Sequence, residues 1–292
     1  MKALISGGAG FIGSNLADKL IQDGHSVVII DNLFTGRKEN LNSEAEFFEL
    51  DISDLESIKP AFKDIDVVFH MAAIPSVPRS IDDPASTFKT NIMGTLNVLL
   101  AARDSGAKKV VYSASSSAYG NQKTLPQIEE FTPDPLSPYA TSKLVGEQLC
   151  RQFTNLFGLD TISLRYFNVY GPRMNEGAYA AVVSTFLRQK KAGQALTVVG
   201  DGMQKRDFTY VSDVVNANIL ASSVEGKGEV VNIGAGDSHS VLELAQIVGG
   251  EIVHLEQRAG EIKNSLADIT KAKNILGWEP KVTLKEGIAK LL

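Results

Sequence analysis

The chain has 292 residues, 43% hydrophobic and 22% charged, which is ordinary composition for one large or two modest globular domains. Its formal net charge of −5 argues against a nucleic-acid partner, and its single cysteine, Cys150, excludes an intrachain disulfide. The four histidines are scattered and no CxxC pair exists, so we expect no metal site. No apolar run approaches the ~20 residues of a membrane span, and MKALISGGAG lacks a signal-peptide core, so we expect a cytoplasmic protein.

The first half of the chain alternates short apolar runs with longer amphipathic segments. The runs are rich in Val, Ile and Phe and lack strict alternation, as is typical of strands buried on both faces; they lie at 2–6, 26–31, 46–52, 66–73 and 108–115. Helical patterns lie between them, for example at 11–24 and at 87–106, which closes with a glycine. This alternation predicts an α/β fold with a doubly wound parallel sheet of the Rossmann type.

The texture of the sequence changes after the segment TISLRYFNVYGP, which predicts a further strand ending at Gly171-Pro172. Beyond it, short strands (LTVVG, EVVNIGAG, EIVHLE) mix with helices in a less regular order. We therefore divide the chain into a first domain, 1–165, and a smaller C-terminal α/β domain, 166–292. Late segments remain free to return to the first sheet.

A glycine loop joins the first predicted strand to the first predicted helix. Gly8-x-Gly10-x-x-Gly13 matches the dinucleotide fingerprint, and Gly7-x-x-Gly10-x-x-Gly13 matches a related spacing. Glycines permit the tight turn and let the backbone approach a pyrophosphate at the helix N-terminus. The strand and helix on either side are the context that supports this interpretation, against a glycine turn without a ligand.

Acidic residues follow the second and third predicted strands. Asp31 ends the second strand, 18 residues after Gly13, where a carboxylate accepts hydrogen bonds from a ribose and repels a 2′-phosphate. This favours NAD over NADP, although Arg37 and Lys38 are near enough to soften the preference. Asp51 and Ile52 end the third strand and either meet the adenine edge or, in the case of Asp51, cap the helix that follows.

Hydroxyl groups and a Tyr-x-x-x-Lys pair supply the candidate chemistry. The fifth strand ends in YSASSSAYG, which delivers Ser115, Ser116 and Ser117 to the edge where ligands bind in such sheets. Tyr139 and Lys143 follow in SPYATSK, four residues apart and therefore on one face of a helix. Alone this is a common surface pair. Beside a dinucleotide fold and strand-end hydroxyls, it predicts a phenol that acts as a base with help from a neighbouring cation.

Together these features resemble the extended short-chain dehydrogenase/reductase family, and most closely its nucleotide-sugar 4-epimerases, which act on UDP-glucose or UDP-N-acetylglucosamine. The resemblance is carried in order along nearly the whole chain by GGAGFIG, DNL, SVPRSIDDP, SASSSAYG, YATSK, RYFNVYGPR, GDGMQKRDFTYVSDV and RAGEIKNSLADITKAKNILGW. It implies a tightly held NAD, an NAD-binding first domain, a nucleotide-sugar-binding second domain and a homodimer. The helices around 84–104 and 137–157 are its candidate dimer contacts.

The resemblance also assigns roles to single residues. Ser115, Tyr139 and Lys143 would be catalytic: the Tyr139 phenolate takes the proton of the sugar 4-hydroxyl, and Lys143 favours the phenolate and holds the nicotinamide ribose. The other residues expected at NAD are Gly7, Gly10, Phe11, Ile12, Gly13, Asp31, Asn32, Asp51, Ile52, Ala72, Ala73, Asn91 and Phe167. Those expected at the UDP-sugar, with Ser115 and Tyr139, are Arg79, Ser80, Ser116, Asn168, Arg206, Arg258, Glu261 and Ser265.

Two features of the sequence narrow the choice among the enzymes of this family. Related dehydratases carry Asp-Glu after the catalytic hydroxyl residue, and related decarboxylases a nearby Glu, whereas this chain has Ser116 and Ser117, which leaves 4-epimerisation as the simplest chemistry. Ser265 takes the place of a gate beside the sugar C2 substituent, and its small size predicts acceptance of UDP-GlcNAc and UDP-GalNAc as well as UDP-Glc and UDP-Gal. The alternatives are a UDP-glucuronate 4-epimerase, another sugar-nucleotide enzyme of this family, and an NAD-binding regulator without activity.

Overall fold

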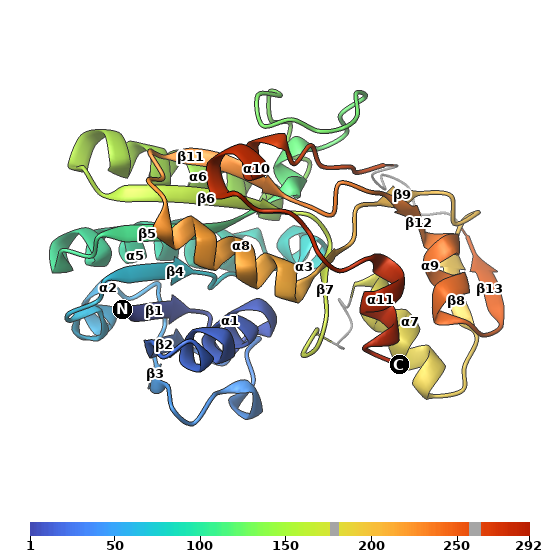
Figure 1. The fold of residues 1–292 in the computed structure, drawn as a ribbon, viewed down its shortest axis with the longest axis horizontal. Helices are drawn as coiled ribbons and strands as arrows, with labels where there is room; N and C mark the ends of the chain where they lie inside the picture. The colour runs from blue at the N-terminus through green and yellow to red at the C-terminus, as the bar shows by residue number, and fades with distance from the viewer. Residues whose placement is uncertain (176–180, 257–263) are drawn as a thin grey trace.

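Seven parallel strands form one sheet in the larger part of the molecule, as its computed structural model shows (Figure 1). The structure describes residues 1–175, 181–256 and 264–292. In spatial order the strands are β11 (Glu229–Ile233), β6 (Asp160–Tyr166), β5 (Lys109–Ser115), β4 (Val67–His70), β1 (Lys2–Ser6), β2 (Ser26–Asp31) and β3 (Glu46–Glu49). The doubly wound sheet predicted from the apolar runs is therefore confirmed.

Alternate residues of each strand point to opposite faces of the sheet and build two cores. In β1, Ala3 and Ile5 join one core and Leu4 joins the other, which explains why the strand sequences are apolar without alternation. The first core is covered by α1 (Phe11–Gln22), α8 (Val211–Ser223) and α10 (Thr270–Leu276). The second is covered by α2 (Leu55–Ile58), η2 (Lys59–Phe62), α5 (Gly94–Ser105) and α6 (Pro138–Phe157).

Short helical turns connect these layers at the carboxyl edge of the sheet. Three of them pack on α6: α3 (Val77–Asp82), α4 (Pro84–Phe88) and the π-helical turn η3 (Lys89–Met93). Two 3₁₀ turns follow strands, η1 (Lys38–Asn40) after β2 and η4 (Ser116–Tyr119) directly after β5.

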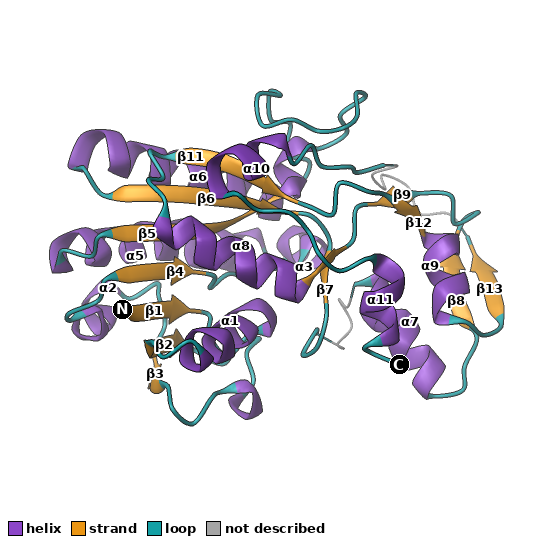
Figure 2. Cartoon of the chain, viewed as in Figure 1, coloured by secondary structure: helices purple, strands orange, loops and turns teal. Residues whose placement is uncertain are grey.

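The smaller part stands beyond the carboxyl ends of the sheet strands, whose arrowheads point toward it in Figure 2. It holds the pairs β7 (Val169–Tyr170) with β10 (Thr209–Tyr210), β8 (Leu196–Val199) with β13 (Ile252–Leu255), and β9 (Lys205–Arg206) with β12 (His239–Ser240). Its helices are α7 (Val182–Lys191), α9 (Val241–Val248) and α11 (Leu284–Ala289). Because α8, β11 and α10 lie on the larger part, segments after residue 166 do return to the first sheet; the division at 165/166 itself stays a prediction.

Among the residues that the structure describes, no helix is long and apolar enough to cross a membrane. Within the same ranges, no group of three or more His, Cys, Asp or Glu side chains is placed to hold a metal ion.

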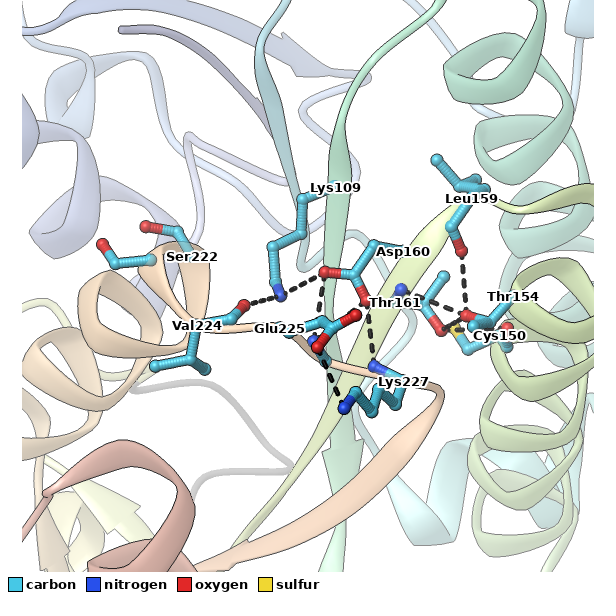
Figure 3. Close-up of polar contacts among 12 residues, drawn as sticks. Lys109, Cys150, Thr154, Leu159, Asp160, Thr161, Ser222, Val224, Glu225 and Lys227 are labelled. Atoms are coloured by element: carbon cyan, nitrogen blue, oxygen red, sulfur yellow. Dashed lines mark hydrogen bonds and ion pairs between the residues drawn. The ribbon is translucent and has the colours of Figure 1, made fainter.

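At the amino edge of the sheet, a buried ammonium group joins three strands (Figure 3). Lys109, at the start of β5, donates to the Asp160 carboxylate at 2.7 Å and to the Val224 carbonyl. Asp160, at the start of β6, also accepts the backbone N–H groups of Gly226 and Lys227, which lead into β11. Burial acts to raise the pKa of Asp160, but the bonds from Lys109 and Gly226 outweigh it and hold the pKa below its usual value.

Asp160→Asn should therefore destabilise the fold by about 2–4 kcal/mol, because it leaves a buried ammonium without its counter-charge. The measurement is chemical denaturation at pH 7. Since the folded pKa is depressed, the stabilisation is present above the unfolded value of about 4 and is lost as pH falls through the folded pKa, so the gap between parent and variant should close in acid. Glu225→Gln, in the exposed pair with Lys227, is the control and should leave the midpoint unchanged. An equal loss in both variants would contradict the assignment.

Candidate active site

A cavity of about 390 Å³ lies along the carboxyl ends of the central strands. Most of the residues predicted to hold a cofactor line it: Gly7, Gly10, Phe11, Ile12, Gly13, Asp31, Asn32, Asp51, Ile52, Ala72, Ala73, Tyr139 and Lys143. They come from segments spread over nearly half of the chain, and the parallel sheet gathers them at one edge.

The glycine loop leaves space for a ligand at Gly10, whereas at Gly7 and Gly13 the packing of the fold itself requires glycine. A Cβ at Gly7 would lie 2.7 Å from the Ala72 nitrogen, and a Cβ at Gly13 would lie 2.3 Å from the Gly7 oxygen, so both glycines are required by packing. A Cβ at Gly10 would meet only the Gly7 oxygen, at 3.2 Å, and otherwise faces open space. Gly10 is the N-cap of α1 and offers no side-chain cap, which leaves the first N–H groups of the helix for an anion.

Asp31 joins the loop after β1 to the loop after β2 by hydrogen bonds. It is buried, and its carboxylate accepts the N–H of Ala9 at 3.0 Å and the N–H of Leu33 at 2.8 Å. Burial raises the pKa of Asp31, while these two bonds act in the opposite direction. Arg37, predicted to soften the preference for NAD, also lines the cavity, and its effect on that preference stays a prediction.

Asp51 lines the cavity and does not cap the following helix. It accepts the Ser53 N–H at 2.8 Å and the Asn32 amide at 3.1 Å, whereas Asp54 caps α2 by accepting the Ser57 N–H. Burial acts to raise the pKa of Asp51, but the bonds from Ser53 and Asn32 prevail and lower it. The structure thus excludes Asp51 as the helix cap, and its contact with the adenine edge stays a prediction.

Helix α6 carries Tyr139 and Lys143 to the end of β5. Ser137 starts the helix by accepting the Ala140 N–H. The buried Lys143 ammonium donates to the Ser113 carbonyl of β5 at 2.8 Å. Close approach of α6 to β5 is possible because residue 146 is glycine: a Cβ there would lie 2.1 Å from the Tyr112 hydroxyl oxygen.

The electrostatics of these groups suit proton transfer. Burial lowers the pKa of Lys143 to about 8, so the amine stays largely protonated at pH 7. Burial raises the pKa of Tyr139, and a hydrogen bond with the Ser115 side chain acts against this. The Ser115 hydroxyl oxygen also accepts from the N–H and hydroxyl of Ser117, at 3.2 and 2.9 Å. Tyr139 and Lys143 thus line the cavity, and the strand-end hydroxyl of Ser115, which is not among the lining residues, contacts Tyr139.

Asn91 and Phe167, predicted at NAD, are not among the residues that line the cavity. Asn91 is buried behind its wall, where it accepts the Ile74 N–H at 2.8 Å and donates to the Ser142 hydroxyl at 3.0 Å. Phe167 is buried against Tyr119. The structure gives Asn91 a supporting position, since Ile74 lines the cavity and Ser142 lies on α6.

Several residues predicted at the nucleotide sugar meet on the other side of β5. The Asn168 amide donates to the Ser265 hydroxyl at 3.3 Å. Arg206 lies on β9, and the backbone carbonyl of Lys205, the other residue of β9, accepts the Ser265 N–H. Ser116 follows Ser115 in η4. Arg258 and Glu261 lie outside the described residues.

Arg79 and Ser80, which were predicted to lie beside the sugar, make their contacts within α3 and with Phe34 at the cavity. Ser80 is buried in α3 and donates to the Val77 carbonyl at 2.7 Å. The Arg79 guanidinium lies over the Phe34 ring, 4.2 Å from its centroid, and Phe34 lines the cavity. A contact of either side chain with the sugar stays a prediction.

Sequence reasoning missed ten polar residues that also line the cavity: Thr35, Asn40, Ser53, Ser86, Lys89, Thr90, Ser113, Tyr166, Arg173 and Asn175. Ser113 lies near the carboxyl end of a predicted strand, so the strand-end argument could have found it. Tyr166 could not be found in this way, because β6 ends at Tyr166 whereas the sequence predicted a strand that continues to Gly171-Pro172. Lys89 begins the π-helical turn η3, which has no signal in the sequence.

Comparison with known proteins agrees with this site. The model of the NAD dependent epimerase/dehydratase family matches residues 3–234. The chain belongs to this family. A UDP-glucose 4-epimerase of Mycolicibacterium smegmatis is 40% identical over 99% of this chain and 97% of its own.

Two solved structures of similar proteins cover nearly the whole chain. One is a UDP-glucose 4-epimerase of Thermotoga maritima with UDP-glucose, which is 42% identical, has a TM-score of 0.95 and covers 99% of this chain and 96% of its own. The other is a UDP-N-acetylglucosamine 4-epimerase of Methanobrevibacter ruminantium in complex with UDP-N-acetylmuramic acid, with 36% identity, a TM-score of 0.91 and coverage of 99% and 97%.

NAD is the cofactor of the NAD dependent epimerase/dehydratase family, and the described residues fit it. The glycine loop would hold the pyrophosphate, because Gly10 leaves space in front of the α1 N-terminus. Asp31 would accept from the adenosine ribose. Tyr139 and Lys143 would stand at the nicotinamide end, since they line the same cavity at the end of β5.

Gly10→Ala should fold normally and hold NAD less tightly, because the added methyl stands in the ligand space; we expect a loss of about 5- to 150-fold in affinity. Gly13→Ala should instead lower the thermal midpoint, since its Cβ collides with the Gly7 oxygen of the fold itself. The two measurements are the thermal midpoint and the NAD content after gel filtration. Full NAD retention by Gly10→Ala would remove the loop as the pyrophosphate site.

Proposed function

We propose that this protein is a UDP-hexose 4-epimerase that acts through a transient 4-keto sugar with enzyme-bound NAD. The observation that carries the proposal is that Tyr139 and Lys143 line the cavity and that Ser115 is hydrogen-bonded with Tyr139, with serine rather than a carboxylic acid at the two positions after Ser115. Without an acid there, proton transfers at C5 and C6 lack their agents, while proton removal from the 4-hydroxyl does not. The two UDP-glucose 4-epimerases at 40% and 42% identity support the proposal.

The chain's own residues account for the proton chemistry. Tyr139 as phenolate takes the proton of the sugar 4-hydroxyl and returns it to the same oxygen, O4, when the 4-keto carbon is reduced from its other face. A free phenol has a pKa of about 10, so it needs a nearby positive charge to act near pH 7, and Lys143 provides it. Ser115, hydrogen-bonded with Tyr139, orients the reacting oxygen. NAD, when bound, accepts the hydride from C4 and gives it back.

The test is to incubate the purified protein with UDP-glucose, UDP-galactose, their N-acetylated forms and UDP-glucuronate, and to follow the 4-epimers by NMR. Conversion of UDP-glucuronate alone would select the alternative UDP-glucuronate 4-epimerase. Tightly bound NAD with no conversion of any sugar would select a non-enzymatic regulator on the same fold.

Tyr139→Phe should reduce turnover by at least ~100-fold, because it removes the acid-base group and leaves the packing of the ring in place. NAD content and the thermal midpoint should match the parent. Tyr210→Phe, which removes a hydroxyl from the core of the smaller part, is the control and should keep parental turnover. Near-parental turnover by Tyr139→Phe would show that another group is the base.

We further propose that the enzyme accepts UDP-GlcNAc and UDP-GalNAc. Ser265 is a small residue beside Asn168, and a small residue at the C2 position leaves room for an N-acetyl group. The similar UDP-N-acetylglucosamine 4-epimerase supports this choice.

Ser265→Tyr should therefore suppress the N-acetylated pair selectively, by about 5- to 150-fold in kcat/KM, because a phenol fills the space. The plain hexoses should lose much less. Comparing kcat/KM for both pairs in both proteins decides the matter, with the thermal midpoint as the check on folding. Equal losses for the two pairs, or a parent inactive on N-acetylhexosamines, would remove Ser265 as the gate.

A cytoplasmic homodimer is the proposed state of the protein. Four exposed apolar side chains, Phe88, Met93, Leu156 and Phe157, lie within the two segments predicted as partners, and α4 and η3 pack on α6. Light scattering on the purified protein gives the mass that decides between monomer and dimer.

A further inference from the structure

The carboxylate of Asp207 is buried between β9 and β10, outside the catalytic cavity. It accepts three backbone N–H groups, from Ala235 at 2.6 Å, Gly236 at 3.1 Å and Ala267 at 3.1 Å. Burial raises the pKa of Asp207 to about 6, and the hydrogen bonds act against this, so the group is mostly ionised at pH 7 and these bonds are charge-assisted.

The backbone of the same residue holds two side chains predicted at the nucleotide sugar. The Asp207 carbonyl accepts the Asn168 amide at 3.0 Å, and the Asp207 N–H donates to the Ser265 hydroxyl at 3.4 Å. One residue therefore joins three segments that are far apart in the chain: the end of β6, the turn after β11, and 264–267.

The turn after β11 is shaped to reach this carboxylate. A Cβ at Gly234 would lie 2.4 Å from the Ala267 side chain and 2.8 Å from an Asp207 carboxylate oxygen, so only glycine lets the three segments close together. The close fit shows that the carboxylate and its donors form a specific packed unit.

The sheet order places this unit on the substrate side. The cofactor cavity follows the ends of β1, β2 and β4, while Asn168 and Gly234 follow β6 and β11 on the other side of β5. Tyr166, two residues before Asn168, still lines the cavity beside Tyr139. The packed unit around Asp207 thus adjoins the cavity near Tyr166. Strand β5, which ends at Ser115, lies between the cavity side and the Asp207 side of the sheet.

We propose that Asp207 is the positioning residue of the nucleotide-sugar site: it sets Asn168 and Ser265 side by side and fixes the segment 264–267 against the ends of β6 and β11. This inference rests on the proposed function and adds to it the residue that organises substrate recognition. Asp207 touches neither the cofactor cavity nor Tyr139, so its loss acts on substrate binding and spares proton transfer.

The test compares Asp207→Asn with Asp213→Asn. Both residues are buried aspartates that accept backbone N–H groups, but Asp213 binds those of Lys281 and Val282, away from Asn168 and Ser265. In Asp207→Asn an amide N–H₂ faces N–H donors, so the three segments separate. We expect the KM for UDP-glucose to rise at least ~10-fold, while kcat stays within ~3-fold and NAD content is unchanged. Asp213→Asn should lower stability and leave KM at the parental value.

A second variant tests the same unit with less risk to folding. Asn168 has a φ of +21°, which glycine adopts readily, so Asn168→Gly removes the amide without adding strain. It should also raise KM at unchanged kcat, and the double variant with Asp207→Asn should raise KM less than the product of the single effects. Parental KM in both single variants, or an equal rise in KM for Asp213→Asn, would overturn the proposal.

Calorimetry with UDP as the probe separates this inference from the proposed function. A parent that converts no UDP-sugar rejects the epimerase, and weaker UDP binding by Asp207→Asn than by the parent still supports the positioning role. Equal UDP affinity in the parent and in Asp207→Asn rejects that role, whatever the activity.

Discussion

The hydrogen bond from the Lys143 ammonium to the Ser113 carbonyl determines where helix α6 stands relative to β5. It joins α6 to the last residues of β5, so Tyr139, one turn earlier on α6, and Ser115, two residues later on β5, come together at the same edge. Because Lys143 is buried, the bond is made in a medium of low polarity, where an unpaired ammonium would be costly. Under the proposed function the same charge would favour ionisation of the phenol, so that one group would both fix the geometry and adjust the chemistry.

The position of β5 in the sheet separates two tasks. On one side, the loops after β1, β2 and β4 form a cavity whose glycine turn and acidic residues suit a dinucleotide. On the other side, the ends of β6 and β11 meet the short strands of the smaller part around Asp207. A group carried by β5, or by the helix packed on it, can reach both. The chain order of the strands does not show this division, which arises only when β11 pairs with β6.

The parts of this structure that sequence could predict are those set by local pattern. Apolar runs gave the central strands, and the glycine spacing placed the cavity loop, because both follow from side-chain period and backbone conformation within a few residues. The stacking of Arg79 on Phe34 and the position of Asn91 behind the cavity wall depend on contacts between residues 17 to 51 apart or on a π-helical turn, and no local pattern specifies them. Asp207 is the extreme case: the backbone N–H groups that its carboxylate accepts lie 28, 29 and 60 residues away, so its importance appears only in the folded chain.

The contact between Gly146 and Tyr112 also restricts how this protein can change over generations. The Tyr112 phenol occupies the space that a side chain at residue 146 would need, because a Cβ there would lie 2.1 Å from the phenol oxygen. A larger residue at 146 is tolerable only in a lineage whose residue at 112 has already become smaller. The opposite order passes through an ancestor whose α6 is pushed away from β5, with Tyr139 displaced from Ser115. Substitutions at residues 112 and 146 can therefore occur in only one order, although neither residue lines the cavity.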